Sequence, residues 1–377
     1  MTTFSFLMVF AMAFAAGVAC AYYATRKRVK LIRKPPAPRH VMSNALEYRL
    51  SMGPHIVALG GGTGLSTLLA GLKGFTRNIT AVVAVTDEGG SSGRLRQEWG
   101  VLPPGDIRNC IVALAENGSS LSSILNYRFD RGELNGHSLG NIIILAATEL
   151  MGDFQRAVLE LNKLLAIRGQ VLPVTTENVV LKGKTADGTV LTGELEVSDN
   201  GSNLTELWIE PSDAEPVEAV TAAFDDADVI VLGPGSLFTS VMPNLLLSRV
   251  TGLLKETSAP ILYIANLMTQ PKETEGMNIL SHIDWIAGVL GRVPNYVLVN
   301  ESAIPTEFIS SYGKIGAEPL YLSSKEEAYL ESLGSKVIYG DYCEIKNGKY
   351  LRHNAQNLSE TIMEICRTRQ KSARQEK

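Results

Sequence analysis

Two glycine-rich segments, each placed directly after an apolar run, constrain the fold of this 377-residue chain more than any other feature. The first run, Ile56–Leu59, is followed by three glycines, and an amphipathic pattern begins at Leu65. The second run, Ile79–Val85, is followed by a segment rich in glycine and serine. If the two runs form neighbouring parallel strands, both segments lie at one edge of the sheet. Phosphorylated ligands bind at that edge in open α/β sheets.

Apolar runs and amphipathic segments alternate along the rest of the chain, which predicts an α/β fold with a doubly wound, mostly parallel sheet. The expected strands are apolar on both faces, as strands covered by helices on both sides are. They are Ile56–Leu59, Ile79–Val85, Val229–Leu232, Ile261–Ala265 and Tyr296–Val299. The expected helices are Leu65–Leu72, Ile107–Ala115, Ser138–Leu150, Phe154–Leu165, Val217–Phe224 and Met277–Leu290.

The pattern changes between Gln170 and Pro211. An apolar run at Val179–Leu181 precedes two segments that alternate polar with apolar residues, Val190–Val197 and Leu204–Ile209. Asp-Gly and Asn-Gly pairs separate the three segments, as in hairpins. We therefore expect an antiparallel β insertion at about residues 170–211, within an α/β domain over residues 54–345. A C-terminal helix and tail would cover residues 346–377.

The first residues have a different character. Residues 4–23 are almost purely apolar and uncharged, which is long enough to span a bilayer as a helix. Basic residues follow in the linker 24–53 and none precedes the span, so the positive-inside rule places the main domain in the cytoplasm. A cleaved signal peptide with Ala19-Cys20-Ala21 as its processing site is the alternative, but the basic residues that should precede it are missing. We expect an uncleaved membrane anchor.

Composition narrows the classes of protein to which the chain could belong. Charged residues make up 20% of the chain and hydrophobic residues 45%, as in an ordinary globular protein. A net charge of -4 gives no reason to expect a nucleic-acid partner. The four cysteines lack the spacing of a zinc site and favour a reduced compartment.

The first glycine-rich segment lets the backbone approach a phosphate and directs helix N–H groups toward it. It differs from the dinucleotide fingerprint, which would need a glycine at Leu65, and from a P-loop, which would need Gly-Lys-Ser/Thr. A tight turn without a ligand is the alternative. The candidate ligand-binding residues of this first segment are Gly60, Gly61, Gly62, Thr63 and Gly64.

The second segment begins with two acidic residues. Asp87 stands at the end of the second strand, where an acidic residue commonly holds ribose hydroxyls. The carboxylates of Asp87 and Glu88, together with a phosphate, would also suit magnesium. The chain is expected to continue as a loop whose N–H groups bind an anion, with a helix beginning only at Arg94. A flexible solvated loop is the alternative. The candidates are Gly89, Gly90, Ser91, Ser92, Gly93 and Arg94.

Four further loops supply polar residues. Asp106 is expected to cap a helix and to bring Arg108 and Asn109 near the site. His137 and Asn141 open another helix, although a lone histidine is often structural. The loops after Val229–Leu232 and Ile261–Ala265 lie at the carboxyl ends of their strands. They add Gly233, Gly235, Ser236, Asn266, Thr269 and Gln270 to the candidate ligand-binding residues.

Taken together, these loops resemble those of the gluconeogenesis factor family, in the superfamily of 2-phospho-L-lactate transferase. The resemblance runs from about His55 to Asn300 and implies a Rossmann-like fold. Glu88 departs from the family pattern, which has a second aspartate there, and so does Lys272, where glycine is common. The N-terminal anchor is not part of the family core. The matching segments are GGGTGLS, DEGGSSGRLR, PPGDIRN, GHSLGN, GPGSLFTS and NLMTQPKET.

The resemblance implies a regulator that binds a UDP-sugar, UDP-N-acetylglucosamine in particular, and acts on cell shape and wall synthesis during gluconeogenic growth. The glycine segments would hold the diphosphate. The transferase branch implies an alternative, a magnesium-dependent transfer of a phospholactyl-type group, in which Asp87 and Glu88 hold the metal and His137 positions or deprotonates the acceptor. We also expect a homo-oligomer and wall-synthesis proteins as partners.

Overall fold

A computed structural model describes residues 38–116 and 118–375 of the chain. The chain divides into two compact units between Arg49 and Leu50, and helix α2 (Pro38–Ser51) carries that boundary. The membrane span expected at residues 4–23 lies outside the described residues. Within them, no single helix is long and apolar enough to cross a membrane. One pair of segments, Leu237–Leu245 and Ser248–Glu256, reaches that composition together but is bent by 77°.

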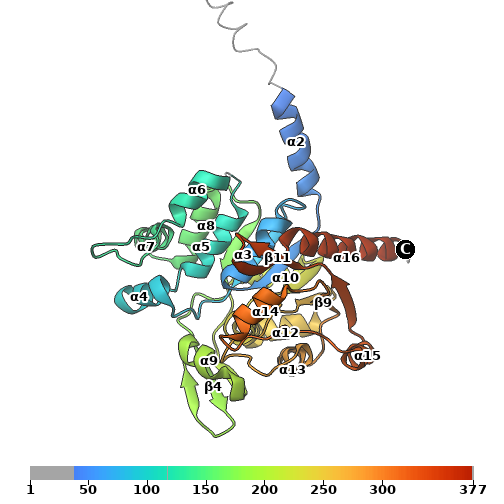
Figure 1. The fold of residues 1–377 in the computed structure, drawn as a ribbon. Helices are drawn as coiled ribbons and strands as arrows, with labels where there is room; N and C mark the ends of the chain where they lie inside the picture. Colours follow the sequence, from blue (N-terminus) through green and yellow to red (C-terminus); the bar gives the residue numbers. More distant parts are fainter. Residues whose placement is uncertain (1–37, 117, 376–377) are drawn as a thin grey trace, which may run out of the picture. The chain divides into compact units, whose positions relative to one another are not determined.

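A seven-stranded parallel sheet forms the centre of the unit 50–377, as expected for the α/β class (Figure 1). Its strands are β1 (Ile56–Gly60), β2 (Ile79–Val83), β3 (Gln170–Pro173), β7 (Val229–Leu232), β8 (Ile261–Ile264), β9 (Tyr296–Asn300) and β10 (Lys336–Gly340). They lie in the order β10-β9-β8-β7-β1-β2-β3. Chain order therefore reverses beside β1, and β1 pairs in parallel with both β2 and β7. Such a switch point opens a crevice at the carboxyl ends of the strands.

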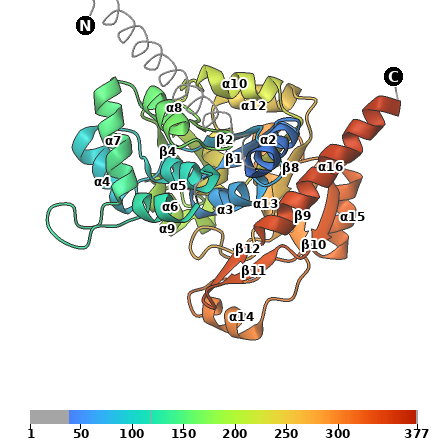
Figure 2. The same ribbon diagram turned by 90° about the horizontal axis from the view of Figure 1, so that it is seen from above.

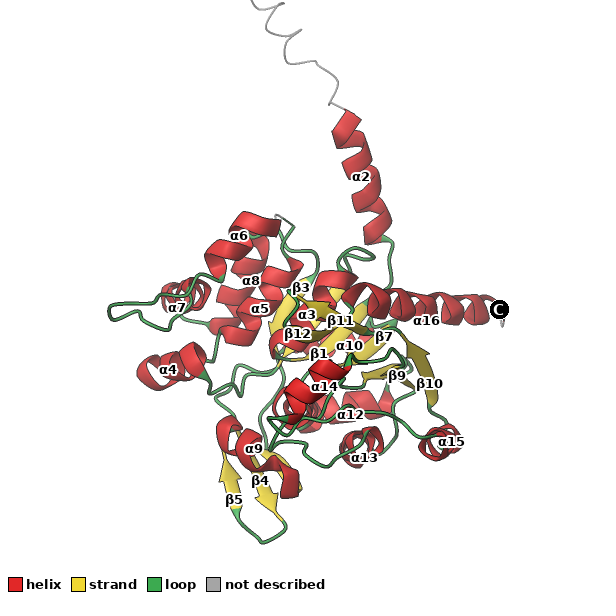
Figure 3. Cartoon of the chain, viewed as in Figure 1, coloured by secondary structure: helices red, strands yellow, loops and turns green. Residues whose placement is uncertain are grey.

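Helices cover both faces of this sheet. On one face, α3 (Gly62–Leu72) packs against α5 (Gly105–Leu114) and α16 (Ala355–Gln375). On the other, α12 (Ser248–Glu256) packs against α10 (Glu218–Asp225) and α13 (Ile279–Leu290). Figure 3 shows α3 and α16 on one side of the strands and α12 and α13 on the other. The remaining helical segments are α4 (Gly90–Trp99), α6 (Gly118–Leu125), α7 (Leu139–Met151), α8 (Phe154–Leu164), α9 (Glu194–Asn200), η1 (Gly201–Asn203), η2 (Leu237–Val241), α11 (Met242–Leu245), α14 (Thr306–Gly313) and α15 (Ser324–Ser332).

Local sequence explains where the helices begin and end. The side chain of Ser138 accepts the N–H of Asn141 at the start of α7, and that of Asp153 accepts the N–H of Arg156 at the start of α8. Between them, Gly152 ends α7 with a left-handed φ of 65°. The five expected strands and six expected helices are all present, with boundaries shifted by no more than about one turn.

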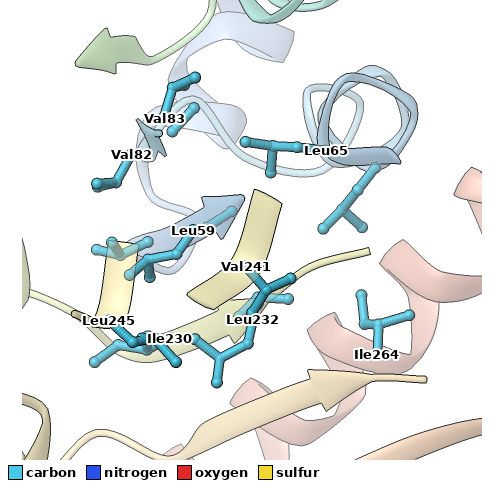
Figure 4. Close-up of a cluster of buried hydrophobic side chains, with 14 of the residues drawn as sticks. Leu59, Leu65, Val82, Val83, Ile230, Leu232, Val241, Leu245 and Ile264 are labelled. Atoms are coloured by element: carbon cyan, nitrogen blue, oxygen red, sulfur yellow. The ribbon is translucent and has the colours of Figure 1, made fainter. Parts of the chain in front are cut away.

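The core fixes the strand ends that carry the loops. The side chains of β1, β2, β7 and β8 are buried throughout these strands, and the apolar ones join those of α3, η2 and α11 in one cluster (Figure 4). Leu59, Leu65 and Leu232 are fully buried within it. Burying a leucine contributes about 1.5–3 kcal/mol. The loops that follow these strands therefore begin at the buried core of the unit 50–377.

The antiparallel insertion is present but shorter than expected. Strands β4 (Val180–Thr185), β5 (Val190–Thr192) and β6 (Leu204–Glu210) form a separate sheet in the order β5-β4-β6. The expected strand Val190–Val197 is wrong beyond Thr192, because Gly193 turns the chain with a φ of 94° into α9. The first residues of the expected insertion, Gln170–Pro173, are instead the edge strand β3, paired in parallel with β2.

The C-terminal region adds elements that the sequence patterns did not predict. Strand β10 extends the main sheet beyond β9. A hairpin of β11 (Cys343–Lys346) and β12 (Tyr350–His353) follows it, before α16 begins at Ala355. The hairpin packs with α14 around a second small core, formed by Leu267, Ile304, Phe308 and Leu351.

Candidate functional site

The loops after β1 and β7 interlock at the switch point. Gly62 opens α3 with a left-handed φ of 61°, and Gly233 leaves β7 with a φ of 80°. A Cβ atom on Gly64 would lie 2.2 Å from the carbonyl oxygen of Pro234, so only glycine allows this approach. The predicted convergence of the two loops is therefore observed, and each fixes the other.

Asp106 contacts the first glycine loop. The prediction that Asp106 caps a helix is wrong, because α5 already begins at Gly105 and Asp106 lies in its first turn. Its carboxylate instead accepts the N–H of Gly62. Burial and the charge of Asp87 raise the pKa of Asp106 to about 7. An internal carboxylate therefore occupies one of the N–H groups that were expected to face a phosphate.

The second glycine segment is a helix. The expected loop over Gly89–Gly93 is wrong, because α4 begins at Gly90, whose φ of 46° suits glycine. Both serines are buried and face protein groups. The hydroxyl of Ser91 meets the Nδ1 atom of His137 at 3.0 Å, and that of Ser92 accepts the N–H of Gly105 at 3.0 Å. The serine hydroxyls therefore lock α4 to its neighbours.

His137, which precedes α7, and Asn141, on α7, both contact α4. His137 is 3% exposed, and burial followed by the charge of Arg94 lowers its pKa. The side-chain amide of Asn141 donates to Ser91 at 3.0 Å, while its Oδ1 is buried without a partner in the described chain. Arg94 donates to the carbonyl of Asn135 at 2.7 Å. His137, Asn141 and Arg94 therefore lie on the β2 side of the switch point, where they hold the loop that precedes α7.

Asp87 and Glu88 diverge. Asp87 accepts the N–H of Gly89 at 2.8 Å and lies beside Gly105 at the start of α5. The Glu88 carboxylate lies against Gly193, where a Cβ atom would be 2.1 Å from its Oε2. The backbone N–H of Glu88 donates to Glu194 at 3.1 Å. The charge of Asp87 raises the pKa of both Asp106 and Glu194, so these two carboxyls lie near it, whereas the Glu88 carboxylate lies against Gly193. The pairing of Asp87 with Glu88 at a metal ion stays a prediction.

Glu194 and Glu273 are acidic residues that sequence analysis did not select. Glu273 is fully buried; its Oε1 accepts the N–H of Phe238 at 2.9 Å, and its Oε2 has no partner among the described residues. Burial raises the pKa of each carboxyl to about 7. Neither follows a strand of the sheet directly. The available sign was weak: a glutamate directly after the turn Pro271-Lys272.

A common arrangement links these observations. An internal carboxylate accepts an N–H group of each loop at the switch point: Asp106 at Gly62, Asp87 at Gly89, Glu194 at Glu88 and Glu273 at Phe238. Over residues 38–116 and 118–375, no group of three or more His, Cys, Asp or Glu is placed to hold a metal ion. Asp87 and Asp106 still suit magnesium, which commonly uses one or two carboxylates together with ligand phosphates and water.

A cavity of about 340 Å³ opens beside the first loop, on the β7 and β8 side. We call it the switch-point pocket. Asn266 contributes a buried Oδ1 without a partner in the described residues, and Ser236 donates to the side chain of Gln270 at 2.6 Å. The far wall comes from α14 and the C-terminal hairpin. The lining residues are Thr63, Gly64, Thr67, Pro234, Gly235, Ser236, Asn266, Leu267, Met268, Thr269, Gln270, Pro271, Tyr312, Ile315, Ala317, Leu351, Arg352 and His353.

The predicted site residues therefore separate into two groups. Thr63, Gly64, Gly235, Ser236, Asn266, Thr269 and Gln270 line the switch-point pocket, which Gly60 and Gly233 approach from their strands. Asp87, Ser91, Ser92, Arg94, Asp106, Arg108, Asn109, His137 and Asn141 lie on the β2 side, on or near α4, α5 and α7. Sequence analysis missed Tyr312, Arg352 and His353, because they follow the last recognised loop and lack glycine-rich neighbours.

The fold and the loops match known proteins. The family model for 2-phospho-L-lactate transferase CofD matches residues 56–343. The gluconeogenesis factor of Halalkalibacterium halodurans is 42% identical over 312 residues, covering 82% of this chain and 96% of that protein. That of Bacillus subtilis is 38% identical over 316 residues, covering 83% and 98%. A crystal structure of a Bacillus halodurans protein is similar with a TM-score of 0.78 at 40% identity, covering 82% of this chain and 99% of that one. The chain therefore belongs to the CofD family and, within it, to the gluconeogenesis factors.

Proposed function

We propose that this gluconeogenesis factor binds a UDP-sugar, with UDP-N-acetylglucosamine as the leading candidate. The observation that carries the proposal is the switch-point pocket, which joins the N-terminus of α3 to an apolar, aromatic wall. Pockets for nucleotides combine these two features, with N–H groups near the phosphates and flat or apolar side chains around the base.

The base would lie against the C-terminal wall. Tyr312, Ile315 and Leu351 supply aromatic and apolar surface. The unpartnered Oδ1 of Asn266 and the guanidinium of Arg352 offer an acceptor and donors for a pyrimidine edge. Arg352 is held beside Tyr350, 5.3 Å from the ring centroid. The diphosphate would then extend from this wall toward Thr63 and Gly64.

Negative charge around the first loop leads to a requirement for a cation. Asp87 and Asp106 carry carboxylates next to the N–H groups that a diphosphate would approach. Like charges repel in a partly buried site. A magnesium ion held by Asp87 and Asp106 would offset that repulsion.

The direct test is calorimetric titration of the full chain with UDP-N-acetylglucosamine, with and without magnesium. We expect binding that magnesium strengthens, and Tyr312→Ala should weaken it about tenfold or more because a stacked aromatic ring is lost. The matched control is Tyr321→Ala, which removes an exposed ring outside the pocket. No heat from a folded sample with any UDP-sugar would refute the proposal.

A second candidate is a magnesium-dependent transferase that moves a phospholactyl-type group from a nucleotide diphosphate donor. The carboxylates of Asp87 and Asp106 favour it, because transfer of a phosphorus-containing group needs a metal-bound diphosphate and little covalent help from the protein. Asp106→Asn separates the candidates. A regulator should retain binding with a weaker dependence on magnesium, whereas a transferase should lose release of nucleoside monophosphate.

The biological setting belongs to the same proposal. We infer that the protein is anchored to the membrane by residues 4–23, faces the cytoplasm, and relays the level of a wall precursor to wall-synthesis proteins that control cell shape. Supporting this are the uncharged apolar span and the basic residues after it. Fractionation of cells that express the full chain and a chain lacking residues 1–37 tests the anchor: only the full chain should sediment with membranes.

A further inference from the structure

Three arginines gather on the β2 side of the switch point, away from the pocket described above. We call Arg94, Arg108 and Arg128 the arginine cluster. Arg94 donates to the carbonyl of Asn135 at 2.7 Å, and Arg128 donates to the carbonyl of Gly136 at 2.5 Å. Arg108 donates to the side chain of Asn126, which lies on the same loop as Arg128. All three arginines therefore hold the loop that joins α6 to α7.

Carboxylate partners are scarce for these arginines. In the described part of the chain, the one carboxylate within ion-pair distance of the cluster is Glu98, whose Oε1 lies 4.0 Å from the Nε of Arg94. Asp106 and Asp87 attract Arg108 at longer range. Arg108 donates to Asn126 at 2.9 Å, but its Nε is buried without a partner among these residues. Arg108 and Arg128 therefore hold one loop with no carboxylate of the described chain within ion-pair distance, an arrangement that favours an anion between them.

Two residues of α7 that lie beside Arg108 also support a ligand at the arginine cluster. The stem of Arg108 is packed against Gly140, where a Cβ atom would lie 2.7 Å from its Cγ and Cδ. Asn141, 2% exposed, keeps an unpartnered buried Oδ1 beside this contact, so it can accept a hydrogen bond from a protonated ligand group. The loop between α6 and α7 extends away from its flanking helices in Figures 1 and 2. Arg128, which belongs to this loop, is exposed.

We propose that the arginine cluster is a second binding subsite, which takes a phosphate or carboxylate group of an acidic small molecule separate from the nucleotide. The order of the strands in the sheet shows that this subsite is separate from the switch-point pocket. The switch-point pocket follows β7 and β8, whereas Arg94 and Arg108 lie on α4 and α5, after β2. The first glycine loop lies between them. The subsite goes beyond the proposed nucleotide function and can exist without it.

The test is calorimetric titration of the full chain with inorganic phosphate, and with acetate to tell the two chemistries apart. Arg128→Gln should weaken phosphate binding at least tenfold, because a charge-assisted hydrogen bond is lost. Its matched control is Arg131→Gln on the same loop, whose side chain is 92% exposed. Arg108→Gln should act like Arg128→Gln, and the exposed position of Arg128 keeps the test valid if the buried variant fails to fold. Unchanged phosphate affinity in Arg128→Gln, or no phosphate binding by the folded wild type, overturns the proposal.

Titration with UDP in the same proteins separates this proposal from the nucleotide function. Arg128→Gln should bind UDP as the wild type does, while Tyr312→Ala should lose UDP affinity and keep phosphate affinity. If no variant binds UDP but phosphate binding still depends on Arg128, the nucleotide proposal fails and the arginine subsite stands. A loss of UDP affinity in Arg128→Gln equal to its loss of phosphate affinity would show one site, and would refute a separate subsite.

Discussion

At the scale of single residues, the site is defined by carboxylates as much as by glycines. Glycine-rich loops suggest free N–H groups for a phosphate. In this protein, Asp106, Asp87, Glu194 and Glu273 already accept N–H groups from those loops. These N–H groups therefore already have partners within the protein. The cation dependence proposed for nucleotide binding follows from the charge of Asp87 and Asp106.

Replacing Glu273 tests how much its buried carboxylate lowers the free energy of unfolding. Its pKa of about 7 lies above the ordinary value, so the folded state binds the proton more tightly than the unfolded state. The wild type should therefore lose stability as the pH rises from about 5 through 7, by about 2–3 kcal/mol. Glu273→Gln keeps an acceptor for Phe238 and lacks this loss. Its free energy of unfolding in urea should gain on the wild type between pH 5 and pH 8, whereas the exposed Glu275→Gln should not; an equal pH dependence in Glu273→Gln and the wild type would contradict the prediction.

Lys272 shows how a departure from the family pattern is accommodated. Its φ of 66° is left-handed, which explains why glycine is common at this position. The side chain reaches Asp199 of α9 at 3.0 Å, with both groups 65% exposed. An exposed ion pair contributes about 0.2–1 kcal/mol, comparable to the cost of the backbone conformation.

Two substitutions of Lys272 separate these contributions. Lys272→Gly should change the free energy of unfolding by less than about 1 kcal/mol, because relief of strain offsets the lost ion pair. Lys272→Ala loses the ion pair and keeps the strain, so it should be less stable than Lys272→Gly by about 1 kcal/mol. Equal stability of the two variants in urea titrations would show that the backbone is not strained here.

At the scale of elements, a helix or strand could be predicted when residues close in sequence determine it, and was missed when contacts with distant residues do. Strands β1, β2, β7, β8 and β9 were predicted because each is an apolar run covered on both faces. The first turn of α4 was predicted to be a loop because glycines open it, and its serines are held by Gly105 and His137, partners that sequence spacing does not reveal. Strands β3 and β10 were missed because they are edge strands, and β10 is partly exposed, so it lacks a continuous apolar run. Residues far apart in sequence also supply the wall of the pocket.

The contact between the first loop and the loop after β7 gives an element-scale prediction. Gly64→Ala would place a methyl group within 2.2 Å of the Pro234 carbonyl oxygen, and both partners are backbone. The loops must then separate, at a cost of about 1–3 kcal/mol. Thermal unfolding should occur at a lower temperature, and UDP-sugar affinity should fall with it. Gly252→Ala is the control, since nothing lies within 4 Å of a Cβ atom there; wild-type stability in Gly64→Ala would contradict the packing.

At the scale of the whole molecule, the switch point divides the chemistry in two. The pocket over β7 and β8 has aromatic and apolar walls, while the β2 side carries the carboxylates and the arginine cluster. The doubly wound fold and the convergence of the loops were predictable from the sequence. The division into two sides was not, because it depends on strand order and on the C-terminal hairpin that closes the pocket.

The measurement that tests this account most directly is a crystal structure of the protein with UDP-N-acetylglucosamine and magnesium. We predict that the uracil ring lies against Tyr312 and Arg352 in the switch-point pocket, that the diphosphate lies at Thr63 and Gly64, and that magnesium lies at Asp87 and Asp106. A nucleotide bound at the arginine cluster, with the switch-point pocket empty, would contradict the central claim.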